Sequence, residues 1–120
     1  MKLSHVTIRT GHFSEEIKFY QEIAGLGIVR DLREIGEGIV FLSDEAQDVR
    51  IEIIHTPDAA DAGNENLSVG FITEDAAAKR EDLIRRGMDV TPMASPVPSV
   101  QFFFVKDPAG VRVQFLHEEG

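Results

Sequence analysis

The residues of this chain best suited to chemistry on a small molecule are three arginines, Arg9, Arg50 and Arg112, and one acid, Glu52. Guanidinium groups on neighbouring strands can bind a carboxylate or phosphate through paired hydrogen bonds. A surface that gathers these four side chains is locally positive, although the whole chain carries a net charge of −9. The pattern predicts a small anionic ligand. The alternative is that the arginines extend into solvent.

These residues belong to a passage that occurs twice. Residues 49–54, VRIEII, return as residues 111–116, VRVQFL. Residues 3–8 are loosely similar to residues 66–71, at nearly the same offset of about 60 positions. Two degenerate copies of one structural unit are therefore predicted.

The copies differ at two chemically important positions. Glu52 in the first copy corresponds to Gln114 in the second, and His5 corresponds to Ser68. A carboxylate and an imidazole can bind metals and move protons, whereas an amide and a hydroxyl are weaker metal donors. The differences indicate where a site should be sought.

Each copy is expected to run as a strand, a helix and three further strands. Ser14 can cap the first helix, and Gly25 and Gly27 end it. Asp75 can cap the second helix, which ends at Gly87. Alternation and turn residues predict strands over 3–9, 27–34, 38–43, 49–55, 67–73, 88–91, 100–105 and 111–117.

The length and composition favour one domain of residues 1–120. With 42% hydrophobic residues the chain can build one core but not two independent ones, so the copies are expected to pack together. A stretch without apolar periodicity separates them. We predict a first module over residues 1–56, a linker over 57–65 and a second module over 66–120.

Alternation along the strands assigns most polar residues to one sheet face. In the first strand Val6 and Ile8 are expected to face the helix. His5, Thr7 and Arg9 then face the opposite way. The same rule adds to that second face Arg50, Glu52, Ile54, Ser68, Gly70, Ile72, Arg112, Gln114 and Leu116. If the copies curl around a common axis, this mixed face lines a ligand cavity.

Several short motifs are familiar from one protein superfamily. They are residues 5–9, HVTIR, residues 14–20, SEEIKFY, residues 25–27, GLG, and residues 107–110, DPAG, before residues 113–115, VQF. Through them essentially the whole chain resembles the vicinal oxygen chelate superfamily, which includes glyoxalase I, bleomycin-resistance proteins and extradiol dioxygenases. The resemblance implies an α+β fold of two βαβββ modules that form a U-shaped, eight-stranded sheet around a cavity, with the helices outside.

The amino-terminal half looks most like bacterial glyoxalase I. Those enzymes take four ligands for nickel or zinc, typically His, Glu, His and Glu, from the first and last strands of the two modules. His5 and Glu52 match the first pair, but Ser68 and Gln114 stand at the second. Arg9 matches the arginine that contacts the glutathione carboxylate.

The resemblance therefore implies an incomplete site for a divalent metal, with His5, Glu52 and Gln114 as ligands. Glu52 and Gln114 stand at the catalytic positions, but an amide cannot take up a proton. Ser68 joins the three arginines as a ligand-binding residue. A simpler interpretation of His5 is a hydrogen bond to Glu52 on a neighbouring strand.

Two functions of different classes remain open. One is a metal-dependent lyase or isomerase of the glyoxalase type that acts on a small anionic metabolite. The other is a metal-free protein that sequesters a small molecule or antibiotic, as bleomycin-resistance proteins do. The pair His5 and Glu52 favours the enzyme, and the pair Ser68 and Gln114 favours the binding protein.

The composition excludes some classes of binding partner and indicates a cellular compartment. The negative net charge argues against nucleic acid and anionic membranes as partners. The chain has no cysteine, which excludes disulfides and thiolate ligands and suits a reducing cytoplasm. No apolar stretch reaches about 18 residues, so we expect a soluble cytoplasmic protein. Sheet edges that need covering predict a homodimer.

Overall fold

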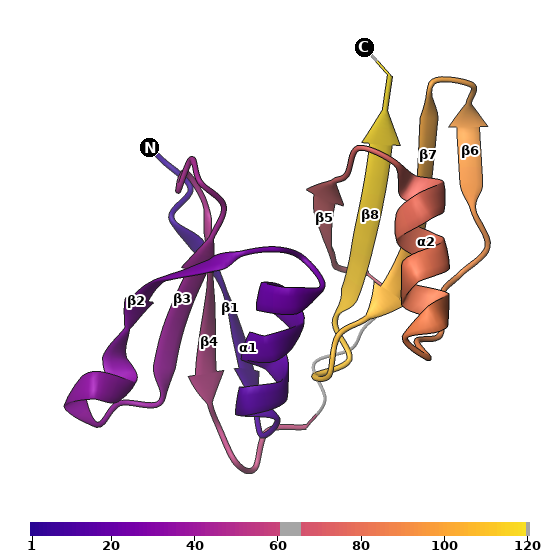
Figure 1. The fold of residues 1–120 in the computed structure, drawn as a ribbon. Coiled ribbons are helices and arrows are strands. Elements are labelled where there is room, and N and C mark those ends of the chain that lie inside the picture. Colours follow the sequence, from indigo (N-terminus) through magenta and orange to yellow (C-terminus); the bar gives the residue numbers. More distant parts are fainter. Residues whose placement is uncertain (61–65, 120) are drawn as a thin grey trace. The chain divides into compact units, whose positions relative to one another are not determined.

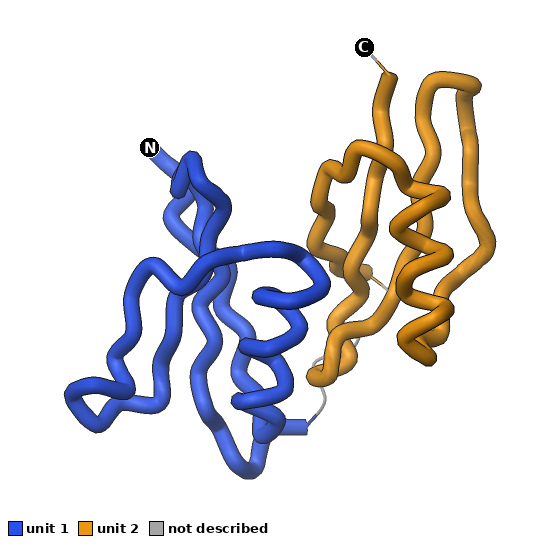
Figure 2. Tube along the Cα trace, viewed as in Figure 1, with its two compact units in different colours: residues 1–62 blue, residues 63–120 orange. Residues whose placement is uncertain are grey.

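A computed structural model describes residues 1–60 and 66–119. The chain divides into two compact units, residues 1–62 and residues 63–120, shown in blue and orange in Figure 2. Each unit combines one α-helix with a four-stranded mixed sheet (Figure 1), so the fold class is α+β, as predicted. The predicted linker falls partly on residues 61–65, which lie outside the described residues.

The first unit has the strand order β1-β4-β3-β2. Strand β1 runs parallel to β4, and the other neighbours are antiparallel. Its elements are β1 (His5–Thr10), α1 (Phe13–Glu22), β2 (Gly27–Asp31), the 3₁₀ helix η1 (Leu32–Ile35), β3 (Ile39–Ser43) and β4 (Arg50–His55).

Helix α1 packs against β3 and β4 and closes the core of the first unit. Ile17, Tyr20 and Ile23 follow at intervals of three and are all buried, because that spacing keeps them on one side of the helix. The strand residues that face the helix are buried as well: Ile8, Val40, Leu42, Ile51 and Ile53. Alternate strand residues therefore point into this core, as the sequence predicts, although Val6 near the start of β1 is exposed.

The second unit repeats the arrangement with the order β5-β8-β7-β6. Strand β5 runs parallel to β8, and helix α2 packs against β7 and β8. Its elements are β5 (Ser68–Ile72), α2 (Ala76–Arg85), β6 (Ala94–Val97), β7 (Val100–Lys106) and β8 (Arg112–Glu118). No helix in the described part of the chain is long and apolar enough to cross a membrane.

Aromatic residues form much of the core under α2. Phe103 and Phe115 are buried, with ring centres 5.7 Å apart. The Lys79 ammonium lies 5.0 Å from the centre of the Phe115 ring, and burial lowers the pKa of Lys79. Phe102 and Phe104 are only half-buried, because alternation turns them to the opposite face of the sheet.

The registers of the two sheets correspond residue by residue. Thr7 of β1 pairs with Glu52 of β4, and Gly70 of β5 pairs with Gln114 of β8. The repeat seen in the sequence is therefore a repeat of structure, in which Glu52 and Gln114 hold equivalent positions.

Two predicted boundaries are wrong. Helix α1 begins after His12 rather than Ser14, without a side-chain cap. The strand predicted at residues 88–91 is reduced to one bridge between Val90 and Val105, and β6 begins only at Ala94. Pro92 cannot donate a backbone hydrogen bond, so pairing with β7 is interrupted there.

Strand β2 is also shorter than predicted. The Asp31 carboxylate accepts hydrogen bonds from the backbone and the side chain of Arg33, which turns the chain into η1. The same side-chain hydrogen bonds hold the pKa of Asp31 below its usual value. Gly36, with a φ of 84°, ends this turn in the left-handed region.

The cap of α2 gives a test of the fold. The Asp75 carboxylate accepts the Ala78 N–H at 3.0 Å. Replacing Asp75→Ala removes this acceptor and should lower the free energy of unfolding by about 1 kcal/mol, measured by urea denaturation. Asp75→Asn keeps an acceptor and should lose much less. Equal stability of Asp75→Ala and the wild type would contradict the assignment of Asp75 as the cap of α2.

Candidate functional site

Glu52 is the centre of a polar cluster on the first unit. The Thr7 hydroxyl donates a hydrogen bond of 2.6 Å to Glu52 Oε1. His5 Nε2 lies 3.5 Å from the same oxygen, and the Ser4 hydroxyl lies 2.9 Å from His5 Nδ1. The Glu52 side chain is 14% exposed, and that of His5 is 37% exposed. The structure thus brings His5 and Glu52 together.

The local sequence explains why this cluster forms. Thr7 precedes the buried Ile8 in β1, and Glu52 lies between two buried isoleucines in β4, so both project from the face opposite α1. His5 stands two residues before Thr7 and therefore shares that face. Phe41 of β3 pairs with Glu52, and its ring is perpendicular to that of His5, with ring centres 5.7 Å apart. We call this surface the polar face of unit 1.

Two predicted arginines lie on the same face. Arg9 is exposed next to Ile54, and Arg50 is half-buried between His5 and Ser43 in the register of the sheet. In the described residues neither guanidinium makes an ion pair with Glu52. The glutamate is satisfied instead by the neutral Thr7 hydroxyl and the nearby imidazole, which leaves the arginines available to another anion.

The other predicted residues lie on the equivalent face of the second unit, which we call the polar face of unit 2. Ser68 pairs with Arg112, and Gly70 pairs with Gln114. A Cβ atom at Gly70 would stand 3.2 Å from Gln114 Oε1, so the glycine leaves room for the amide. The Arg112 guanidinium lies 4.3 Å from the centre of the Phe104 ring.

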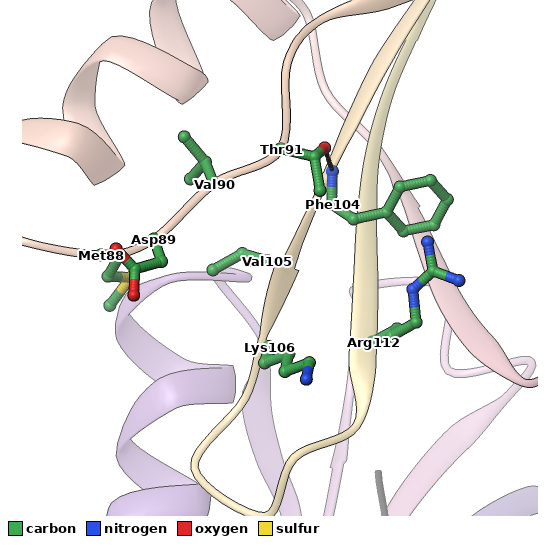
Figure 3. Close-up of a pocket in the computed structure, with 8 residues that line it drawn as sticks. All are labelled: Met88, Asp89, Val90, Thr91, Phe104, Val105, Lys106 and Arg112. Carbon is green, nitrogen blue, oxygen red and sulfur yellow. Dashed lines mark hydrogen bonds between the residues drawn. The ribbon is translucent and has the colours of Figure 1, made fainter. Parts of the chain in front are cut away.

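A pocket of about 490 Å³ lies in unit 2 (Figure 3). Its lining comes from the segment after α2, from the end of β7 and from the start of β8: Met88, Asp89, Val90, Thr91, Phe104, Val105, Lys106 and Arg112. The Phe104 N–H donates to the Thr91 hydroxyl at 2.8 Å, and this hydrogen bond joins β7 to the segment after α2. The volume is in the range of small-molecule sites.

The sequence predicted only one residue of this pocket, Arg112. Lys106 was missed, although it stands directly before the motif at residues 107–110, which lies between the last two predicted strands. Asp107 and Val111 are joined across the turn by a backbone hydrogen bond, so Lys106 and Arg112 face each other. Counting outward from the turn would have found the pair.

The residues present do not fit the four-ligand metal centre of the glyoxalase type. The described residues contain no group of three or more His, Cys, Asp or Glu placed to hold a metal ion. The positions in unit 2 equivalent to His5 and Glu52 are Ser68 and Gln114. A hydroxyl and an amide are poor substitutes for imidazole and carboxylate toward nickel or zinc.

The Thr7 hydrogen bond can be tested by stability. Thr7→Val keeps the shape and the preference for a strand but removes the donor to a largely buried carboxylate. We expect the free energy of unfolding to fall by about 1.5 kcal/mol, because hydrogen bonds to charged groups are among the stronger ones. Thr7→Ser keeps the hydroxyl and should retain most of that stability in urea denaturation. If the serine variant were the less stable of the two, the hydrogen bond would have to be rejected.

The chain is similar to known proteins over nearly its whole length. Lactoylglutathione lyases of Neisseria meningitidis (serogroup A) and Haemophilus influenzae are 27% and 28% identical over 99% of this chain, and they match over 92% and 94% of their own lengths. Among solved structures, the fosfomycin resistance protein FosX of Listeria monocytogenes has a TM-score of 0.79 at 15% identity, with 99% of this chain and 94% of that chain covered.

The antibiotic-binding protein TnmS3 of Streptomyces sp. CB03234 has a TM-score of 0.76 at 16% identity, with 99% of this chain and 97% of that chain covered. At such low identity these two likenesses concern the fold alone. The sequence profile of one family matches residues 2–115. The chain therefore belongs to the glyoxalase/bleomycin resistance protein/dioxygenase superfamily, as its motifs predict.

Proposed function

We propose that this protein binds a small anionic molecule without a metal ion. The observation that carries the proposal is the equivalence of Ser68 and Gln114 to His5 and Glu52 in the registers of the two sheets. A metal centre of the glyoxalase type needs strong ligands at all four positions, and two of them are weak donors here. Binding, by contrast, needs only shape and complementary charge.

The charges on the polar faces support an anion as the ligand. Arg9 and Arg50 project from the polar face of unit 1, and Arg112 projects from that of unit 2. Arginine matches the planar geometry of a carboxylate and keeps its charge at any physiological pH. Glu52 opposes them on the polar face of unit 1, but its Oε1 already accepts the Thr7 hydroxyl.

A second candidate is a metal-dependent lyase or isomerase. It is favoured by the 3.5 Å approach of His5 to Glu52 and by the names of the lactoylglutathione lyases that the chain resembles. In this case His5 and Glu52 would be the strong ligands for nickel or zinc, and Glu52 would also be the base. Gln114 cannot take that role, and loss of a general base costs about 10²–10⁴ in rate.

Other expectations remain predictions from the sequence. They are the packing of both modules into one domain, the U-shaped sheet around a cavity, the cytoplasmic location and the homodimer. The homodimer is supported by the open outer strands of each sheet, since unpaired strand edges are usually covered. Pro96 in β6 cannot donate to a further strand, which makes that edge the less suitable one for pairing.

The metal question has a direct test. Tag-free protein treated with a chelator and dialysed against nickel or zinc should retain much less than one ion per chain in elemental analysis. His5→Ala should change this little, and His12→Ala serves as a matched control, because His12 is exposed and lies 3.5 Å from Glu15. Stoichiometric retention with submicromolar affinity, lost in His5→Ala but not in His12→Ala, would establish the enzyme instead.

The ligand class can be tested by thermal-shift screening of organic acids, thiol conjugates and neutral aromatic antibiotics. We expect anionic compounds to raise the melting temperature. Arg9→Ala should weaken the best anionic compound about tenfold, equal to about 1.4 kcal/mol. Arg85→Ala, at an exposed arginine of α2, should leave it unchanged. If only uncharged or cationic compounds bind, or if Arg9→Ala has no effect, the anion proposal must be abandoned.

A further inference from the structure

The polar face of unit 2 also carries a group of apolar side chains. Leu116 of β8 lies between Ile72 of β5 and Phe102 of β7, and Phe102 pairs in turn with Ala94 of β6. Ile72 is 79% exposed, and the other three are half-buried. Apolar side chains gathered on an exposed sheet face often mark a binding site. We call these four residues and Phe104 the aromatic surface.

Gln114 lies at the edge of the aromatic surface, between Phe104 and Gly70 in the register of the sheet. In unit 1 the equivalent Glu52 accepts the Thr7 hydroxyl. Gly70 stands in the place of Thr7, and among the described residues the Gln114 carboxamide makes no hydrogen bond. A carboxamide offers one acceptor oxygen and two N–H donors. These groups are therefore left to water or to a ligand.

The structure leaves room beside this carboxamide. Apart from the chain neighbours of Gly70, one atom of the described residues lies within 4 Å of a Cβ built at that glycine, and this atom is Gln114 Oε1 at 3.2 Å. A larger side chain at Gly70 would cover the amide oxygen, as Thr7 covers the Glu52 oxygen in unit 1. The glycine thus allows a ligand to approach Gln114 from the side of β5.

The two phenylalanines of the aromatic surface suit contact with a third ring. The rings of Phe102 and Phe104 are nearly perpendicular, at 81°, with centres 5.8 Å apart. A ring that stacks on one of them meets the other edge-on, and both arrangements are favourable. The Arg112 guanidinium lies over the Phe104 ring (Figure 3), so Phe102 is the ring on which we expect a ligand to stack.

The charges in this part of the sheet favour a neutral group. The row across the sheet that contains Gln114 adds only Gly70 and Phe104, and the row of Leu116 is apolar throughout. Neither row contains a charged residue. A charged group bound there would lose its hydration without an opposite charge beside it, whereas an uncharged polar group can exchange water for Gln114.

We propose that unit 2 binds an uncharged aromatic amide, with its ring against Phe102 and Leu116 and its amide paired with Gln114. A primary amide or a lactam has its N–H and C=O on the same side, so it can form two parallel hydrogen bonds with a carboxamide. Leu116 follows Gln114 by two residues, about 6.8 Å along the strand, which an aromatic ring and its attached amide can span. This inference goes beyond the proposed function, which concerns the charge of the ligand, and does not depend on it.

Benzamide is a suitable probe, followed in ¹⁵N–¹H correlation spectra of the full chain. It should shift the side-chain amide signals of Gln114 and the backbone amide signals of Phe102 and Leu116. Gln114→Glu keeps the size of the side chain but replaces its donor by an acceptor, and it should weaken benzamide binding about tenfold. Gln101→Glu makes the same change on the opposite face of β7 and should have no effect.

Three related compounds test the separate parts of the contact. N,N-dimethylbenzamide has no N–H, cyclohexanecarboxamide has no aromatic ring, and benzoate carries a negative charge. At the same concentration each should shift the side-chain signals of Gln114 less than benzamide does. Equal shifts by any of the three, or equal benzamide affinities of Gln114→Glu and Gln101→Glu, would overturn the inference.

A second copy of the chain is the alternative occupant of the aromatic surface. In that case benzamide would leave the Gln114 signals unchanged, and Ile72→Ser would halve the mass measured by light scattering. This result would overturn the inference.

The inference and the proposed function can fail separately. If organic acids bound with the expected dependence on Arg9 and benzamide did not bind, the inference would fall and the proposed function would stand. If benzamide bound as expected, with the loss of affinity in Gln114→Glu, and no organic acid bound, the inference would stand and the proposed function would fall.

Discussion

The parallel pairing of the first and last strands in each unit determines which side chains meet. Its register sets Thr7 beside Glu52 and Gly70 beside Gln114. A shift of one residue along β4 would turn Glu52 toward the core under α1 and expose Ile51 and Ile53 in its place. Burial of an unpaired carboxylate costs several kcal/mol, so the apolar core holds the polar face in register. The positions of the candidate site residues on these four strands depend on this constraint.

The same scaffold carries different chemistry in its two copies. On the polar face of unit 1 a glutamate is satisfied by a hydroxyl and an imidazole, beside Arg9 and Arg50. On the polar face of unit 2 the equivalent residue is the neutral Gln114, and the charges are the cations Arg112 and Lys106. This difference favours binding of an anion over metal-assisted proton transfer, because the second copy offers positive charge where a metal centre needs imidazole and carboxylate.

Much of the fold could be predicted because it follows from short-range patterns. Alternation identified the buried faces of β4 and β8, and Asp75 identified the start of α2. It was less accurate at the sheet edges, where Val6 of β1 is exposed and β5 contains no fully buried residue. The position of β6 could not be predicted in this way. Residues 88–91 have the composition of a strand, but Pro92 and the hydrogen bonds between Thr91 and Phe104 allow only one bridge before the chain pairs again.

The candidate site was predicted less completely than the fold. The approach of His5 to Glu52 follows from two adjacent strands, so alternation was sufficient to expect it. The pocket of unit 2 depends on how the segment after α2 passes β7, which no periodicity describes. The pairing of Lys106 with Arg112 could have been inferred from the turn between them. Lys106 alone gives no indication that it lines a pocket.

The most direct test of metal-independent anion binding is isothermal titration calorimetry of the tightest organic acid found for this protein. The titration would be run on chelator-treated protein and again after addition of nickel or zinc. We predict the same affinity with and without metal, and weaker binding as the salt concentration rises, because the attraction is between charges. Binding that appears only after metal is restored would contradict this account.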